Sequence, residues 1–311
     1  MYTYNIIYMY IKHMFKRKYF WFYILIILCL IYFASASNNQ LNRTEGFSQA
    51  KPFVLKSDHL AYDDFYAEIY DIIHLPEKSA KFDYDTIISA TMPNKDMTNF
   101  LVVGSGTGDL VNSLTQNGFN AHGIDKSQAM INASKNKFPA IDNLCACVES
   151  TSSYDKNTFT HITCLDFTLY YMKDKYEFFR RCYNWLIPNG YLIVHIVDKN
   201  NFTPVKPCVN KILDIQISKD NALKNINRTN VDFGDFVYNV NYDMKSSGDL
   251  ITKETFTDKG SKKVRQNEIT MRVEDSEHIL TVARNAGFIQ HSRFDLPDDS
   301  NQHVIIFERI G

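Results

Sequence analysis

Residues 101–110 read Leu-Val-Val-Gly-Ser-Gly-Thr-Gly-Asp-Leu, and residues 123–125 read Gly-Ile-Asp. The apolar run that ends at Val103 predicts a strand, and the segment after the glycines predicts a helix that leads to a second strand. Glycines between a strand and a helix let the backbone approach a ligand closely. Asp125 closes the second strand, where a carboxylate can accept hydrogen bonds from both hydroxyls of a ribose. This order of elements predicts a nucleoside site.

The chain alternates between strand-like and helix-like segments on both sides of this motif. We expect helices at 58–74, 108–118, 127–137, 174–186 and around 279–287, and strands at 99–103, 120–124, 144–148, 159–165, 191–197, 288–294 and 303–308. Such alternation implies crossover connections, and therefore parallel strands with helices on both faces. The predicted fold class is α/β, a doubly wound, mainly parallel seven-stranded sheet.

A different rhythm follows Asp198. Residues 232–243 and 250–272 alternate apolar and polar side chains around Ser246-Ser247-Gly248 and around Lys259-Gly260. Period-two alternation around turn residues is typical of antiparallel hairpins. We therefore predict an inserted antiparallel cap over 198–274, within a domain that spans 57–311.

The N-terminal region carries a long apolar segment. Residues 1–18 end in the basic run Lys16-Arg-Lys18, and residues 19–36, YFWFYILIILCLIYFASA, contain no charge. At about 1.5 Å per residue this segment approaches the roughly 30 Å thickness of the hydrocarbon core. It predicts a single-pass transmembrane anchor, followed by a polar linker over 37–56. The alternative is a cleaved signal peptide, because Ala34-Ser-Ala36 resembles a cleavage site.

The side of the membrane on which the domain lies stays open. Positive charge before the segment favours an N-terminus in the cytosol and a domain outside. If the domain uses a cofactor that is made in the cytosol, it is expected on the cytosolic side instead.

Composition excludes several classes of protein. The chain has 34 Lys and Arg against 35 Asp and Glu, a formal net charge of -1, and 45% hydrophobic residues. Disorder is excluded, and nucleic acid is an unlikely partner although Lys259–Arg265 is locally basic. The six cysteines form no paired zinc motif, and no His, Cys and Asp spacing predicts a metal site.

The residues after Gly106 narrow the choice of nucleoside ligand. A P-loop requires Gly-Lys-Ser/Thr, whereas Gly108 is followed by Asp-Leu. A dinucleotide fingerprint would place Asp109 close to a pyrophosphate, where its charge is unfavourable. A ligand without phosphates fits better, and a nucleotide-dependent dehydrogenase is the weaker rival.

Together these motifs resemble the class I S-adenosylmethionine-dependent methyltransferases. The resemblance includes Val103–Gly108 as motif I, Gly123–Ser127 around the ribose acid, Asn157–Asp166 as the fourth-strand pattern, and Trp185–Val194 as the block that leads into the fifth strand. It implies S-adenosylmethionine as the cofactor. The family often has an acid two residues before the first glycine, and Val102 occupies that place here. Backbone carbonyls of the glycine loop could hold the methionine amino group instead.

The resemblance assigns roles to individual residues. It implies that the glycine loop lines the methionine moiety, that Asp125 binds the ribose and that Lys126 lies near the adenine. Glu149 is the nearest candidate for a contact to the adenine amino group, and Asp166 is the family position nearest to the transferred methyl. Tyr62 and Tyr66 are candidates to cover the cofactor, although tyrosines at helical spacing are also typical of a core. The cofactor-binding candidates are Gly104, Ser105, Gly106, Gly108, Asp125, Lys126, Glu149 and Tyr66.

Methyl transfer requires an aligned nucleophile and, for some acceptors, a base. His195, at the end of the fifth predicted strand, is the candidate general base because the pKa of a free imidazole is near neutral. Asp166 is the second candidate catalytic residue. A buried histidine in the core is the simpler alternative for His195.

The sequence therefore predicts a membrane-anchored methyltransferase. Its acceptor is expected to be a small or lipid-like molecule, because the inserted cap would cover the site. The alternative is a methyltransferase-like fold without catalysis that serves as an anchored binding or scaffold protein.

Overall fold

The computed structural model describes residues 24–28, 47–150, 154–202, 204, 228–297 and 299–311. The chain divides into two compact units, Met1–Glu45 and Gly46–Gly311. In the first unit residues 24–28 are helical, and the rest of the predicted anchor over 19–36 lies outside the described residues. Among the residues that are described, no helix is long and apolar enough to cross a membrane.

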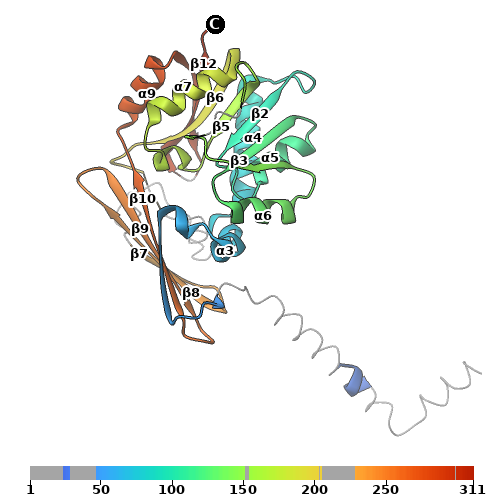
Figure 1. Ribbon diagram of the computed structural model, residues 1–311, viewed down its shortest axis with the longest axis vertical. Helices are drawn as coiled ribbons and strands as arrows, with labels where there is room; N and C mark the ends of the chain where they lie inside the picture. Colours follow the sequence, from blue (N-terminus) through green and yellow to red (C-terminus); the bar gives the residue numbers. More distant parts are fainter. Residues whose placement is uncertain (1–23, 29–46, 151–153, 203, 205–227, 298) are drawn as a thin grey trace, which may run out of the picture. The chain divides into compact units, whose positions relative to one another are not determined.

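The second unit contains a seven-stranded sheet with the order β11-β12-β6-β5-β2-β3-β4 (Figure 1). Its strands are β2 (Asn99–Val103), β3 (Asn120–Asp125), β4 (Asp142–Cys145), β5 (Phe159–Cys164), β6 (Leu186–Val197), β11 (Phe288–Leu296) and β12 (Asp299–Arg309). The pairings from β4 to β6 are all parallel, and β12 is antiparallel to both of its neighbours. The predicted mainly parallel sheet is confirmed. Because β2 lies between β3 and β5, the strand order reverses beside it, and the carboxyl ends of β2, β3 and β5 meet at one edge.

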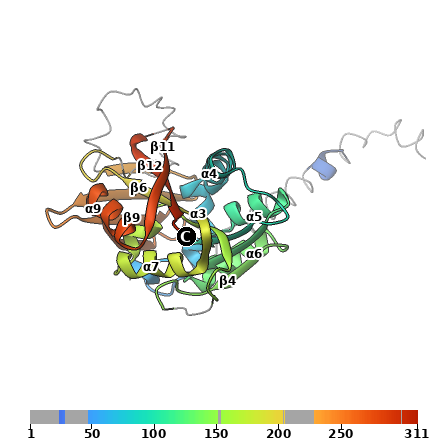
Figure 2. The same ribbon diagram turned by 90° about the horizontal axis from the view of Figure 1, so that it is seen from above.

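Helices cover both faces of this sheet (Figure 2). They are α3 (Asp64–His74), α4 (Pro76–Thr91), α5 (Asp109–Gln116), α6 (Gln128–Lys137), α7 (Lys175–Trp185) and α9 (Ser276–Asn285). One core cluster joins α4 and α5 to β2, β6 and β12 through residues such as Ile87, Val102 and Ile306. A larger cluster joins α7 and α9 to the opposite face and extends into the cap. Successive apolar residues of the buried strands point to opposite faces of the sheet, so each strand contributes side chains to both cores.

The cap is a five-stranded sheet with the order β1-β10-β9-β8-β7. Its strands are β1 (Phe53–Ser57), β7 (Arg228–Asp232), β8 (Phe236–Met244), β9 (Asp249–Asp258) and β10 (Val264–Arg272). The two predicted turns connect β8 to β9 and β9 to β10, as expected. The expected linker over 37–56 is wrong at its end, because β1 pairs in parallel with β10. Residues 205–227 of the predicted insertion lie outside the described residues.

The predicted helix over 58–74 also needs correction. Asp58–Ala61 form a 3₁₀ turn, η2, and α3 begins only after Asp63, whose carboxylate accepts the Tyr66 N–H at 3.3 Å as an N-cap. Pro76 ends α3 as expected, but it also begins α4. The left-handed backbone of Leu75 turns the chain between the two helices, and proline is favoured in the first turn of a helix.

Candidate cofactor and methyl-transfer site

The glycine loop follows β2 at the carboxyl edge of the sheet. The backbone N–H groups of Gly104 and Ser105 both donate to the Ile124 carbonyl, at 2.8 Å and 3.0 Å, which ties the loop to β3. Gly104 has a φ of +71°, and a Cβ on it would lie 2.6 Å from Oγ1 of Thr168. Only glycine satisfies both the backbone conformation and this close approach.

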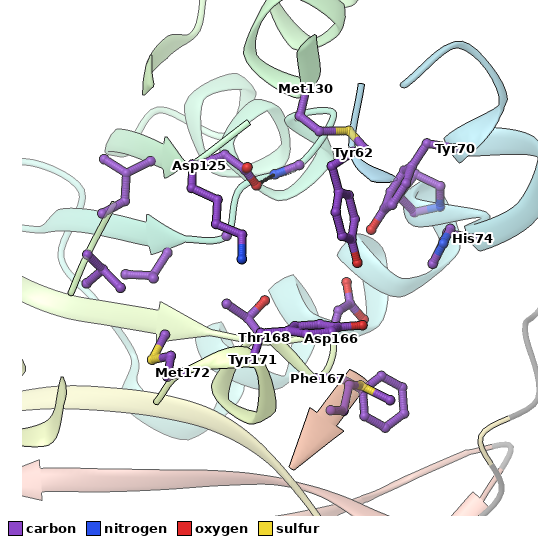
Figure 3. Close-up of a pocket in the computed structure, with 18 of the residues that line it drawn as sticks. Tyr62, Tyr70, His74, Asp125, Met130, Asp166, Phe167, Thr168, Tyr171 and Met172 are labelled. Atoms are coloured by element: carbon purple, nitrogen blue, oxygen red, sulfur yellow. Dashed lines mark hydrogen bonds between the residues drawn. The ribbon is translucent and has the colours of Figure 1, made fainter. Parts of the chain in front are cut away.

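Asp125 organises the loop from the end of β3. Its carboxylate accepts the Gly106 N–H at 3.1 Å and the Ser127 N–H at 2.8 Å. Burial raises the pKa of Asp125, while these two N–H donors and the Lys126 charge act in the opposite direction. The carboxylate is thus held in place beside the loop, with its side chain directed into the cavity described next (Figure 3).

A cavity of about 180 Å³ opens at this edge. The glycine loop, the ends of β3 and β5, helix α3 and the cap strands all contribute to its wall. Figure 3 shows Tyr62 and Tyr70 on one side, directed toward Asp166 on the other. The cap adds Tyr242, Thr252 and Met271. The cavity therefore lies between the sheet edge and the cap, as a substrate site under a cap requires.

Asp166 occupies a strained turn after β5. Both Asp166 and Phe167 have left-handed backbones, with φ of 48° and 60°. Such conformations are costly for residues other than glycine and persist only where surrounding contacts impose them. Phe167 precedes the 3₁₀ helix η3 (Thr168–Tyr171), and its N–H donates to Nδ1 of His195 at 3.2 Å. His195 on β6 therefore supports the turn that presents Asp166 to the cavity.

The structure brings most of the predicted site residues together. The cavity is lined by six of them, Gly104, Gly106, Asp125, Lys126, Glu149 and Asp166. Ser105 lines a smaller hollow beneath the loop. Glu149 also accepts the Lys173 N–H at 2.9 Å, which restrains it at the cavity wall.

Three of the predicted site residues line neither the cavity nor the smaller hollow. Gly108 lines neither hollow and occupies the N-cap of α5 with a φ of +89°. Tyr66 is fully buried, and its hydroxyl group donates to Glu254 of the cap at 3.0 Å, so it joins α3 to the cap and does not face the cofactor cavity.

His195 is only 3% exposed and does not line the cavity. Burial lowers its pKa to about 4, and its Nδ1 already accepts the Phe167 N–H. The structure therefore gives His195 a positioning role in place of the predicted role of general base.

Some residues of the cavity were not predicted from the sequence. Tyr70 and His74 lie one turn apart on α3 with their rings stacked at 4.0 Å, and both face the cavity. Tyr70 follows Tyr62 and Tyr66 at four-residue spacing, which was the available signal. Burial, with the charges of Asp166 and Asp125, raises the pKa of Tyr70 and keeps its hydroxyl group protonated as a donor.

Asp109 disfavours the binding of a phosphate at the N-terminus of α5. Its carboxylate is 7% exposed at the N-terminus of α5 and accepts Nζ of Lys137 at 2.7 Å. Lys137 also reaches Asp71 on α3 at 2.5 Å. The helix terminus is thus already occupied by an internal anion. Within the described residues no cluster of His, Cys, Asp or Glu could hold a metal ion, and the expected absence of a metal stays a prediction.

Comparison with known proteins bears on the same region. Residues 101–194 match the family model described as a methyltransferase domain. This part of the chain is thus similar to a methyltransferase domain. The match spans β2 to β6, and so includes the glycine loop, Asp125 and Asp166. It supports S-adenosylmethionine as the cofactor, as predicted.

Solved structures of methyltransferases are similar in fold to most of the chain. An S-adenosylmethionine-dependent methyltransferase from Clostridium acetobutylicum is 17% identical with a TM-score of 0.58, covering 79% of this chain and 98% of its own. The CcbJ methyltransferase from Streptomyces caelestis is 14% identical with a TM-score of 0.59, covering 81% and 98%.

A third similar structure holds the cofactor. CalS10, an amino pentose methyltransferase from Micromonospora echinaspora with S-adenosylmethionine bound, is 14% identical with a TM-score of 0.53, covering 75% of this chain and 91% of its own. At these identities the likeness establishes the fold alone. No curated protein sequence matches the chain significantly.

Proposed function

We propose that the protein is an S-adenosylmethionine-dependent methyltransferase that acts on a small or lipid-like acceptor. The observation that carries the proposal is the continuity of one cavity from Asp125, through Gly104 and Gly106, to Asp166 and the cap strands. A nucleoside end, a glycine loop and a covered acceptor space therefore share one enclosure, which is what group transfer between two bound molecules needs.

The chain's residues suit each part of the cofactor. Asp125 offers carboxylate oxygens to the ribose, while apolar side chains provide a flat, poorly hydrated surface for the adenine. These apolar lining residues are Ile124, Met130, Ala146 and Val148. Gly104 and Gly106 leave room for the methionine moiety because they carry no side chain. When bound, S-adenosylmethionine supplies an electrophilic methyl group on a sulfonium.

The remaining residues would align the acceptor. Methyl transfer is a displacement in which the acceptor atom forms the new bond as the bond to sulfur breaks, so alignment contributes most of the catalysis. Asp166 lies at the cavity wall on its strained turn, where its carboxylate can accept a hydrogen bond from the acceptor nucleophile and orient it. Tyr62 and Tyr70 lie opposite and exclude water from the same space.

The cap favours a small acceptor. Tyr242, Thr252 and Met271 close the cavity from β8, β9 and β10, which leaves little room for a folded macromolecule. Two similar structures are described as an amino pentose methyltransferase and a sugar N-methyltransferase, which supports a small-molecule acceptor for this chain. The length and apolar character of segment 19–36 support a single-pass membrane anchor. An enzyme anchored in this way would encounter lipid-like acceptors.

Calorimetric titration of the full chain, in a mild detergent, tests the proposal. We expect micromolar binding of S-adenosylmethionine and S-adenosylhomocysteine and none of NADH. Asp125→Ala should abolish this binding, whereas Asp142→Ala, at an exposed acid at the start of β4, should leave it unchanged. A folded chain that binds neither cofactor form would contradict the proposal and favour an anchored scaffold.

A further inference from the structure

A second, smaller hollow lies directly beneath the glycine loop. Its wall includes Gly104, Gly106 and Asp166, which also line the main cavity, so the two spaces are adjacent. The hollow is further lined by Val102, Ser105, Leu165 and Asp83. It therefore lies between the glycine loop and α4, next to the main cavity.

Asp83 is an unusual residue to find there. It lies in the middle of α4 and is 8% exposed. In the part of the chain that the structure describes, no hydrogen bond or ion pair reaches its carboxylate. Burial, together with the charge of Asp166, raises the pKa of Asp83 well above its usual range. The unliganded carboxyl group therefore stays protonated and avoids the cost of a buried charge, and a cation that arrives with a ligand would favour its ionised form.

The proposed cofactor carries one suitable cation at its methionine end. The α-ammonium group of S-adenosylmethionine has three N–H donors and a positive charge, and must lie near the glycine loop when Asp125 holds the ribose. Val102, two residues before Gly104, carries no charge that could pair with this ammonium group. Asp83 and Asp166 both contribute a carboxyl group to the wall of this hollow, whereas the Asp109 carboxylate is already paired with Lys137.

We propose that the Asp83 carboxylate binds the α-ammonium group of the cofactor, supplying from α4 the negative charge that Val102 does not supply from β2. This inference rests on the proposed methyltransferase function. It makes Asp83 a cofactor-binding residue that lies outside the matched methyltransferase domain, 20 positions before its motif in the chain. Helix α4 would then be part of the binding site in addition to its role in the core.

Three ligands separate this role from a structural one. They are S-adenosylhomocysteine, its analogue that lacks only the α-amino group, and 5′-methylthioadenosine, which lacks the whole amino acid moiety. The wild-type full chain should prefer S-adenosylhomocysteine over the deaminated analogue by about 10- to 100-fold, as expected for a charge-assisted hydrogen bond. Asp83→Asn should abolish that preference and leave the affinity for 5′-methylthioadenosine unchanged.

Asp85→Asn is the matched control, because Asp85 lies on the same helix but is exposed. It should preserve the preference. Unchanged binding of S-adenosylhomocysteine by Asp83→Asn would overturn the inference, as would a wild-type chain that does not discriminate against the deaminated analogue. Loss of the preference in Asp166→Asn but not in Asp83→Asn would assign the ammonium group to Asp166 instead.

The same titrations distinguish failure of this inference from failure of the proposed function. A wild-type chain that binds none of the three ligands would contradict the function. A chain that binds all three, with no role for Asp83, would leave the function intact and refute the assignment. Retained binding of 5′-methylthioadenosine shows in each variant that the domain is folded.

Discussion

The backbone N–H of Phe167 donates to Nδ1 of His195 across the end of β5 and β6, at 3.2 Å. Phe167 is one of two consecutive residues with a left-handed backbone, and the other is Asp166 at the cavity wall. A buried acceptor at this point offsets part of the cost of that conformation. His195 thereby controls the position of Asp166 without entering the cavity.

Removing this acceptor should destabilise the protein. His195→Leu leaves the half-buried Phe167 N–H without this acceptor, and we expect a loss of about 1–3 kcal/mol in the free energy of unfolding, measured by urea titration. His195→Asn retains an acceptor close to the position of Nδ1 and should lose less. Equal losses in the two variants would argue that the hydrogen bond contributes little.

The same histidine should make stability depend on pH. Burial lowers the pKa of His195 to about 4, against about 6.5 in the unfolded chain. The unfolded chain therefore binds more protons between these values, so stability is complete above pH 6.5 and is lost as the pH falls toward 4. The full effect is about 3 kcal/mol, since each pKa unit corresponds to about 1.4 kcal/mol.

Unfolding measured at pH 7 and pH 5 checks this sign. His161, buried on β5, has a pKa lowered to about 4 for the same reason and should add a similar slope. His195→Asn should remove its own share and leave that of His161. A pH dependence identical to wild type in this variant would contradict the assignment.

A side chain at Gly123, within β3, should destabilise the protein. A Cβ there would lie 1.8 Å from Oδ1 of Asn143 and 2.8 Å from Cβ of Ser105 in the glycine loop. Gly123→Ala should cost about 1–3 kcal/mol and weaken cofactor binding, because relief of the clash must displace either neighbour. Gly260→Ala, where the nearest atom would be 3.6 Å away, is the control and should have little effect.

A second substitution separates the clash from the loss of glycine itself. Asn143→Ala removes the closest atom, so the double variant Gly123→Ala with Asn143→Ala should lose less stability than the sum of the two single variants. Strict additivity, seen in thermal unfolding, would show that Asn143 is not what excludes the side chain.

Glu254 should hold the cap to α3. Its Oε1 accepts hydrogen bonds from the hydroxyl groups of Tyr66 on α3, at 3.0 Å, and Tyr238 on β8, at 2.8 Å. Glu254→Ala leaves both hydroxyl groups buried without this acceptor and should cost about 2–4 kcal/mol. Glu254→Gln keeps an acceptor oxygen and should cost less. Glu268 on β10, a half-exposed acid paired with Lys253, is the control, and Glu268→Ala should cost less than about 1 kcal/mol.

Met92 offers a stabilising change. It closes α4 with a φ of 44° and is 83% exposed, so its side chain contributes little to packing while its backbone is strained. Met92→Gly should raise the free energy of unfolding by about 0.5–1 kcal/mol. Met97 is also exposed but has no positive φ, so Met97→Gly should bring no gain. A loss of stability in Met92→Gly would contradict the argument from backbone strain.

The sequence by itself determined the features that depend on local order along the chain. The run of apolar residues before Gly104, the glycines and Asp125 are adjacent in sequence, and their period and spacing define a strand, a turn and a second strand whose ends must meet. The parallel sheet and most of the residues at its edge could therefore be predicted. The two hairpins of the cap followed from period-two alternation in the same way.

Tertiary structure decided what depends on contacts between distant segments. β1 pairs with β10 more than 200 residues away, and its short edge-strand sequence carries no signal of that partner. Tyr66 and Tyr70 share one helix and one residue type, yet only packing sends Tyr66 to the cap and Tyr70 to the cavity. Asp83 and His195 likewise have roles set by the elements around them: burial without a partner marks the first for a ligand, and burial with a backbone donor makes the second a support.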